Sequence, residues 1–198
     1  WWVDCATLPL WLGDEGSTAI LALHILRGAR PLLMSGAYHL GTLDPYLTAI
    51  SFGLFGTNLL AVRLVSHAGA LISALLAYLI ARKIGGARSG LLAATLVILP
   101  SPFVFVWSAM SLVPYASFAA TILFVLYTTL LVLERPGGAR WMLAGFAWGL
   151  GVWNSLLAGA YVAVCAGVLA FSTHLRRKDI VALGVGLIVG ASPLICAN

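Results

Sequence analysis

The feature that most constrains this chain is a series of long apolar runs, separated by short basic clusters, that begins after residue 58. Residues 89–133 contain no charged side chain, and residues 59–81 contain one, Arg63. About 20 apolar residues suffice for a helix to cross the hydrocarbon core of a bilayer. The chain has 9% charged residues, against about 25% in soluble domains. The sequence therefore predicts an all-α, polytopic transmembrane helical bundle.

We divide the chain into an opening segment, residues 1–58, and a bundle of about six spans over residues 59–198. The prolines at 100, 102 and 114 break the longest apolar run, because proline removes a helical hydrogen bond. The expected spans are 59–81, 89–107, 115–133, 141–155, 157–173 and 180–197. The stretch 141–173 fits either one long tilted helix or a hairpin of two short ones.

The basic clusters at 82–88, 135–140 and 176–178 decide between these two readings. Positive clusters prefer the cytoplasmic side of a membrane, so an even number of crossings should separate the last two. We therefore favour a hairpin that turns near Asn154 and Ser155. All three clusters then lie in the cytoplasm and the opening segment lies outside. An outside start requires one span before Trp1, so we expect the sequence to be a fragment of a longer chain.

The net charge of +5 resides in these clusters, so we expect membrane lipids and not nucleic acid as partners. The three cysteines show no metal-ligand spacing. Cys5 can pair with Cys196 only if both lie on one side of the membrane. Nothing in this distribution indicates a soluble binding domain.

The opening segment holds most of the polar chemistry, between residues 10 and 47. Ser17 fits the N-cap of an amphipathic helix over 18–28, whose mixed apolar and basic residues suit the membrane interface. Asp44 fits the N-cap of a second interfacial helix, with Pro45 at its first position and Gly56 at its end. A loop joins the two helices, and Asp14 and Glu15 precede the first.

Candidate catalytic residues are the three carboxylates of this segment, Asp14, Glu15 and Asp44. A carboxylate at the membrane surface can deprotonate an acceptor or hold a divalent cation. The cation, if there is one, would lie at Asp14 and Glu15. Taken singly, each acid is better explained as a residue that favours a helix start. Their concentration on one side of so uncharged a chain is what points to a site.

Candidate substrate-binding residues are Arg63, His67, His39 and Tyr46. Arg63 lies one turn inside the 59–81 span, where a cation must reach the interface or find an anion. We weigh these two explanations equally. His67 follows four residues later on the same helix face, and His39 belongs to the loop before Asp44.

These residues resemble a known family, the lipid-phosphosugar-dependent membrane glycosyltransferases of the GT-C class, which include protein O-mannosyltransferases and aminoarabinose transferases. The resemblance covers nearly the whole chain. It rests on Asp14-Glu15, Leu26-Arg27-Gly28, Asp44, Leu54-Phe55-Gly56, the early arginine in 60–64, the segment 143–153 and the segment from Gly190 to Pro193 that leads to Asn198.

The resemblance implies transfer of a sugar from a polyprenyl-phosphate carrier to a glycan, lipid or protein acceptor on the extracytoplasmic face of the cell membrane. It further implies that Asp14 is the acceptor-side base, with Glu15 beside it, and that Asp44 is the second acidic residue of the loop. We expect the fragment alone to be inactive. The alternative is a transporter or scaffold whose external acids only cap helices, although transporters usually carry polar groups at mid-bilayer.

Overall fold

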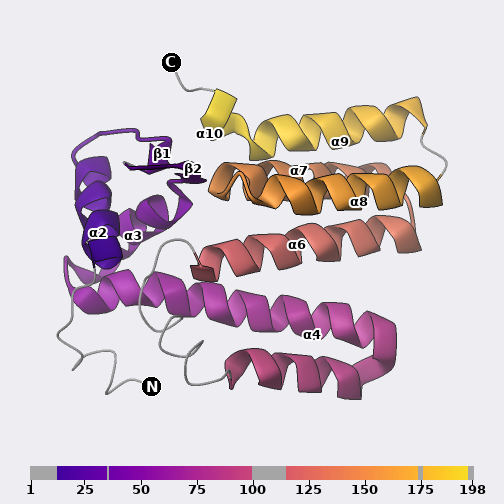
Figure 1. The fold of residues 1–198 in the computed structure, drawn as a ribbon, viewed down its shortest axis with the longest axis horizontal. Helices are drawn as coiled ribbons and strands as arrows, with labels where there is room; N and C mark the ends of the chain where they lie inside the picture. The colour runs from indigo at the N-terminus through magenta and orange to yellow at the C-terminus, as the bar shows by residue number, and fades with distance from the viewer. Residues whose placement is uncertain (1–12, 35, 100–114, 174–175, 196–198) are drawn as a thin grey trace.

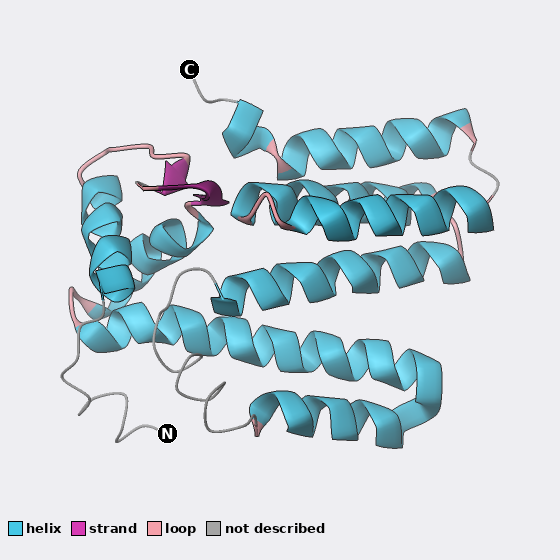
Figure 2. Ribbon diagram, viewed as in Figure 1, coloured by secondary structure: helices cyan, strands magenta, loops and turns pink. Residues whose placement is uncertain are grey.

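The computed structural model describes residues 13–34, 36–99, 115–173 and 176–195, and helices form most of this part of the chain (Figures 1 and 2). The helices are α2 (Gly13–Leu26), α3 (Leu43–Phe55), α4 (Leu59–Ile98), α6 (Tyr115–Glu134), α7 (Gly138–Asn154), α8 (Ala158–Ser172), α9 (Arg177–Gly190) and α10 (Ser192–Ile195). Two short antiparallel strands, β1 (Leu33–Met34) and β2 (Ala37–Gly41), complete it. The prediction of an all-α fold is confirmed.

Helix α4 reverses direction at Gly86, whose φ of 81° is readily adopted only by glycine. Its second part runs back along the first (Figure 1). A Cβ on Gly90 would lie 2.8 Å from a ring carbon of Tyr78, so the two parts are in close contact. The expected turn at Gly85 and Gly86 therefore exists. The continuation of the second part to residue 107, together with Pro100, Pro102, Pro114 and Trp107, lies outside the described residues.

Two helices of the described part are long and apolar enough to cross a membrane, α4 and residues 117–134 of α6. Helices α7, α8 and α9 have 17, 15 and 14 residues, fewer than the roughly 20 of a typical span. The stretch 141–173 forms two helices, α7 and α8, which are separated by the turn 155–157. The number of crossings stays a prediction.

The surface of the helices is unusually apolar, whereas many small and polar side chains face inward. On α3, Asp44, Thr48 and Ser51 are buried, while Ile50 and Leu54 are 61% and 71% exposed. Helix α8 likewise exposes valines, and its Phe171 is nearly fully exposed. Large apolar patches are uncommon on soluble monomers, so this distribution suits a hydrocarbon environment.

Glycines bring α7 and α9 together more closely than larger side chains would allow. A Cβ on Gly145 would lie 2.0 Å from the carbonyl oxygen of Leu183, and a Cβ on Gly186 equally close to that of Met142. Small residues that permit such backbone contact are the usual basis of helix pairing in membranes. The main apolar core lies beside this contact, around Trp141, and is formed by α6, α7 and α8.

The helices of the opening segment begin earlier than the sequence predicts. Within the described residues, helix α2 extends from Gly13, and the Ser17 hydroxyl donates to the Gly13 carbonyl inside the helix. Ser17 is therefore not the N-cap, and Asp14 and Glu15 belong to the first turn. Helix α3 has Thr42 at its N-cap position, so Asp44 lies in the first turn and is not the cap. The end of α3 at Gly56 agrees with the prediction.

The connection between α2 and α3 contains the β1–β2 hairpin, where we expected a loop. We call residues 13–55, comprising α2, β1, β2 and α3, the first-loop module. Figure 1 shows this module at one end of the bundle, beside the α7–α8 turn. The reversal of α4 and the α6–α7 turn lie at the opposite end, where the basic residues gather, and we call this the basic end.

Candidate active site

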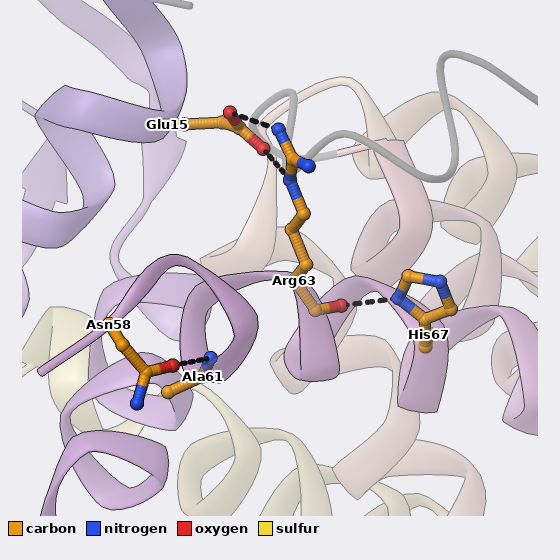
Figure 3. Close-up of polar contacts among 5 residues, drawn as sticks. All are labelled: Glu15, Asn58, Ala61, Arg63 and His67. Atoms are coloured by element: carbon orange, nitrogen blue, oxygen red, sulfur yellow. Dashed lines mark hydrogen bonds and ion pairs between the residues drawn. The ribbon is translucent and has the colours of Figure 1, made fainter. Parts of the chain in front are cut away.

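The first-loop module is attached to the bundle by a buried ion pair between Glu15 of α2 and Arg63 of α4 (Figure 3). Arg63 Nε lies 2.9 Å from Glu15 Oε1, and its Nη2 lies 3.2 Å from Oε2. The two side chains are 0% and 1% exposed. This two-point geometry is the strongest form of carboxylate–guanidinium contact, so it fixes the first turn of α2 against the start of α4.

The first turn of α4 is itself held in place by short polar contacts. The Asn58 side chain accepts a hydrogen bond from the Ala61 amide at 2.8 Å and caps the helix (Figure 3). Ser51 of α3 donates to the Ala61 carbonyl at 2.7 Å. His67 Nδ1 lies 2.6 Å from the Arg63 carbonyl oxygen. Arg63 is thus presented by a helix end whose position both α2 and α3 constrain.

A second contact joins the module to the turn between α7 and α8. The Leu156 amide donates to the His39 carbonyl at 2.9 Å, and Leu40 pairs with Ser155 as in a β-bridge. The Trp153 indole donates to the Leu32 carbonyl at 3.3 Å. The approach is so close that a Cβ on Gly41 would lie 1.9 Å from the Trp153 carbonyl oxygen. The hairpin therefore extends the module onto α7.

Asp44 lies where the module meets the bundle. Its side chain is buried and is hydrogen-bonded to Ser117 of α6. Burial disfavours the charged form and raises the pKa of Asp44 to about 6, although the Ser117 hydrogen bond acts in the opposite direction. A carboxyl group that changes charge near neutral pH is suited to proton transfer.

The structure separates the residues expected from the sequence into two groups. Glu15, Arg63 and His67 meet at the start of α4. Asp44, Tyr46 and His39 lie around α3 and β2, where the Tyr46 ring is 6.3 Å from that of Trp153. The backbone of Asp14 lies in the first turn of α2 beside Glu15, and its side chain is outside the described part.

Metal binding finds no further support in the described ranges, where no group of three or more His, Cys, Asp and Glu side chains could hold an ion. Both carboxylate oxygens of Glu15 already accept hydrogen bonds from Arg63. A divalent cation at Asp14 and Glu15 stays a prediction. Cys165 is a buried free thiol, while Cys5 and Cys196 lie outside the described residues.

Sequence reasoning missed Ser117 altogether and treated Asn154 only as a turn residue. Both are buried, and they are hydrogen-bonded to each other across α6 and α7. The available signal was a polar side chain between apolar runs, which is costly to bury unless it is paired. Periodicity alone could not have shown which residue is its partner.

The fold and these sites define an all-α membrane protein with a polar module attached to one end of its bundle. The chain belongs to the dolichyl-phosphate-mannose-protein mannosyltransferase family, whose model matches residues 41–196. This range includes Asp44, Arg63 and Asn154 but not Asp14 and Glu15. Membership confirms the resemblance to GT-C enzymes and places the chain among the membrane glycosyltransferases. No curated protein and no solved structure matches the chain.

Proposed function

We propose that the full-length protein transfers a sugar from a polyprenyl-phosphate donor to an acceptor on the extracytoplasmic face of the plasma membrane. The observation that carries this proposal is the buried Glu15–Arg63 pair. It fixes the helix turn that contains Asp14, at the end of the bundle opposite the basic end (Figure 1). If the basic end is cytoplasmic, the first-loop module lies outside, where a lipid-linked sugar would be used.

In the proposed reaction, an acceptor hydroxyl or amine attacks the anomeric carbon of the donor sugar. The bond from that carbon to the phosphate oxygen breaks, and polyprenyl phosphate leaves with the electron pair. Asp14 takes the proton of the acceptor as general base, a role that typically contributes about 10²–10⁴-fold to a rate. Attack opposite the leaving group inverts the configuration at the anomeric carbon.

Arg63 acts first as a positioning residue in this proposal, because its guanidinium holds Glu15. Its expected role toward the departing phosphate stays a prediction. That role would require the phosphate to approach the ion pair from the membrane side. The Arg63 guanidinium would then stabilise the negative charge that develops on the departing phosphate. His67, His39 and Tyr46 likewise stay predicted substrate-binding residues.

The test uses the full-length protein reconstituted in liposomes with labelled polyprenyl-phosphate hexoses. Transfer of the labelled sugar and release of polyprenyl phosphate are both measured. Asp14→Asn keeps the shape of the side chain and removes the base, so we expect a loss of about 10²–10⁴-fold. Glu134→Gln is the matched control, because Glu134 is an acid at the opposite end of the bundle and pairs with Lys83 there.

Near-normal transfer by Asp14→Asn, with Glu134→Gln also active, would reject Asp14 as the base and make Asp44 the next candidate. Wild-type protein that moves a lipid-linked sugar across the bilayer without breaking its phosphate bond would instead favour the transporter alternative.

A further inference from the structure

A hydrogen-bonded chain of buried side chains runs from α7 through α6 to Asp44 of the first-loop module. Asn154, the last residue of α7, is 0% exposed. Its Nδ2 lies 3.2 Å from Ser117 Oγ and 3.3 Å from Thr121 Oγ1. Ser117 is in turn hydrogen-bonded to Asp44. Helices α6 and α7 are therefore joined to the distant helix α3 by one polar path.

The number of available hydrogens gives this path a direction. An amide nitrogen has two hydrogens, and the positions of Ser117 and Thr121 account for both. The Thr121 hydroxyl donates its own proton to the Phe118 carbonyl at 2.9 Å. Ser117 Oγ also lies 3.4 Å from Asn154 Oδ1, a longer contact than the one to Nδ2. When Asn154 donates to Ser117, the Ser117 hydroxyl is in a position to donate to the Asp44 carboxylate.

We propose that Asn154 is a positioning residue that acts through Ser117 to hold the carboxyl group of Asp44 in one orientation for the transfer reaction. This inference rests on the proposed function. The backbone next to Asn154 supports it, because Ser155 pairs with Leu40 and the Leu156 amide donates to His39. The segment that orients Asp44 is therefore the same segment that holds β2.

Few other titratable groups belong to the elements around Asp44. Among the residues of α2, β2, α3 and the start of α4 whose side chains are described, they are Glu15, His24, His39, Tyr46, Arg63 and His67. Asp14 and Tyr38 also belong to α2 and β2, and Tyr115 begins α6, but their side chains lie outside the described part. Glu15 and Arg63 neutralise each other. The pKa of Asp44 responds instead to burial, which raises it, and to the Ser117 hydrogen bond, which lowers it. A change in the Ser117 bond should therefore be measurable at Asp44.

The experiment uses the full-length protein in nanodiscs and compares Asn154→Leu with wild type. Infrared difference spectroscopy follows the protonation of Asp44, whose band is identified by its loss in Asp44→Asn. Leucine has the branched shape of asparagine, although it is larger, and it has no donor, so Ser117 loses the amide hydrogen bond that orients its hydroxyl toward Asp44. We expect the titration midpoint of Asp44 to rise by about one pH unit. The acid limb of the transfer rate should move in the same direction.

Three further variants separate positioning from simple stability. Ser117→Ala should give the same rise as Asn154→Leu, and the double variant should be no worse, because both act on one path. Ser117→Thr keeps the hydroxyl and should restore the wild-type midpoint. Thr128→Val is the matched control, since the Thr128 hydroxyl bonds only to carbonyls of its own helix among the described residues. It should leave both midpoint and rate profile unchanged.

An unmoved Asp44 midpoint in Asn154→Leu, or a lower rate with an unmoved pH profile, would overturn the proposal. Should Asn154→Leu fail to fold, the comparison of Ser117→Ala with Ser117→Thr decides in the same way. A raised midpoint in a protein that transfers no sugar in any variant would keep the hydrogen-bonded path and reject the proposed function.

Discussion

The two ends of the bundle each contain an ion pair, and the pairs differ in almost everything except their chemistry. At the first-loop module, Glu15 and Arg63 are no more than 1% exposed. At the basic end, Lys83 and Glu134 approach to 2.6 Å but are 25% and 43% exposed. An exposed pair contributes about 0–1 kcal/mol. Removal of one partner from a buried pair costs about 3–5 kcal/mol, because the other charge is left without compensation.

The module is held by buried contacts that tolerate little change, whereas the basic end is held by exposed contacts that tolerate more. The module adds a buried Asp44 and a hairpin in backbone contact with α7. At the basic end, Arg140 donates to the Leu131 and Arg135 carbonyls and thereby caps the end of α6. We therefore expect the first-loop module to fix the geometry needed for catalysis. The basic end is expected to set the orientation of the chain in the membrane.

The largest effect is expected from breaking the buried pair. Arg63→Met leaves the Glu15 carboxylate buried without its guanidinium, so we expect a loss of about 3–5 kcal/mol in the free energy of unfolding. Equilibrium unfolding in mixed micelles measures it. Adding Glu15→Leu to Arg63→Met should recover most of the loss. A single variant as stable as wild type would show that the pair does not hold the module.

The next effect depends on pH and concerns Asp44. Its folded-state pKa of about 6 lies above the ordinary value of 3.8, so the folded state favours protonated Asp44. Stability should be highest below about pH 4, fall as pH rises through about 6, and be about 3 kcal/mol lower above that. Asp44→Asn has no charge to bury and should lack this decline.

The measurement is thermal unfolding of both proteins between pH 4 and pH 8. Wild type and Asp44→Asn should differ most at pH 8, with the variant more stable, and converge at pH 4. Parallel curves over the whole range would contradict the raised pKa of Asp44.

A smaller effect is expected where β2 touches α7. A Cβ on Gly41 would overlap the Trp153 carbonyl, so Gly41→Ala should cost about 1–3 kcal/mol. Gly53→Ala in α3 is the matched control, because nothing lies within 4 Å of its added Cβ. It should stabilise the protein by about 0.5–1 kcal/mol. Equal effects of the two substitutions in the same unfolding assay would show that the hairpin is not in close contact with α7.

The smallest effect is expected at the basic end. Lys83→Gln removes the exposed pair with Glu134 and a cation above the Tyr127 ring. We expect a change of no more than about 1 kcal/mol, which should diminish further at high salt. A loss comparable to that of Arg63→Met would mean that the two ends are equally constrained.

Local patterns were sufficient for the helices but not for their exact starts. Gly56 indicated the end of α3, and the apolar run from residue 59 lies in the first part of α4. The start of α2 was wrong by several residues, because serine near a helix start indicates an N-cap, whereas Ser17 bonds back to Gly13 inside the helix. The β1–β2 hairpin was missed because its strands are short and because Leu40 pairs with Ser155, which follows α7 and is distant in sequence.

The sequence by itself determined that this is an all-α membrane protein, since uncharged runs of about 20 residues and more cross a bilayer as helices whose backbone hydrogen bonds are all internal. The acids of the opening segment and the early arginine of α4 were also recognisable from the sequence as candidate site residues, because charged side chains are rare in this chain. Only the tertiary structure decided that Arg63 pairs with Glu15, 48 positions away, and that Asn154 reaches Asp44 through Ser117. Helical periodicity specifies which face of a helix is apolar, but partners across helices depend on how the helices pack.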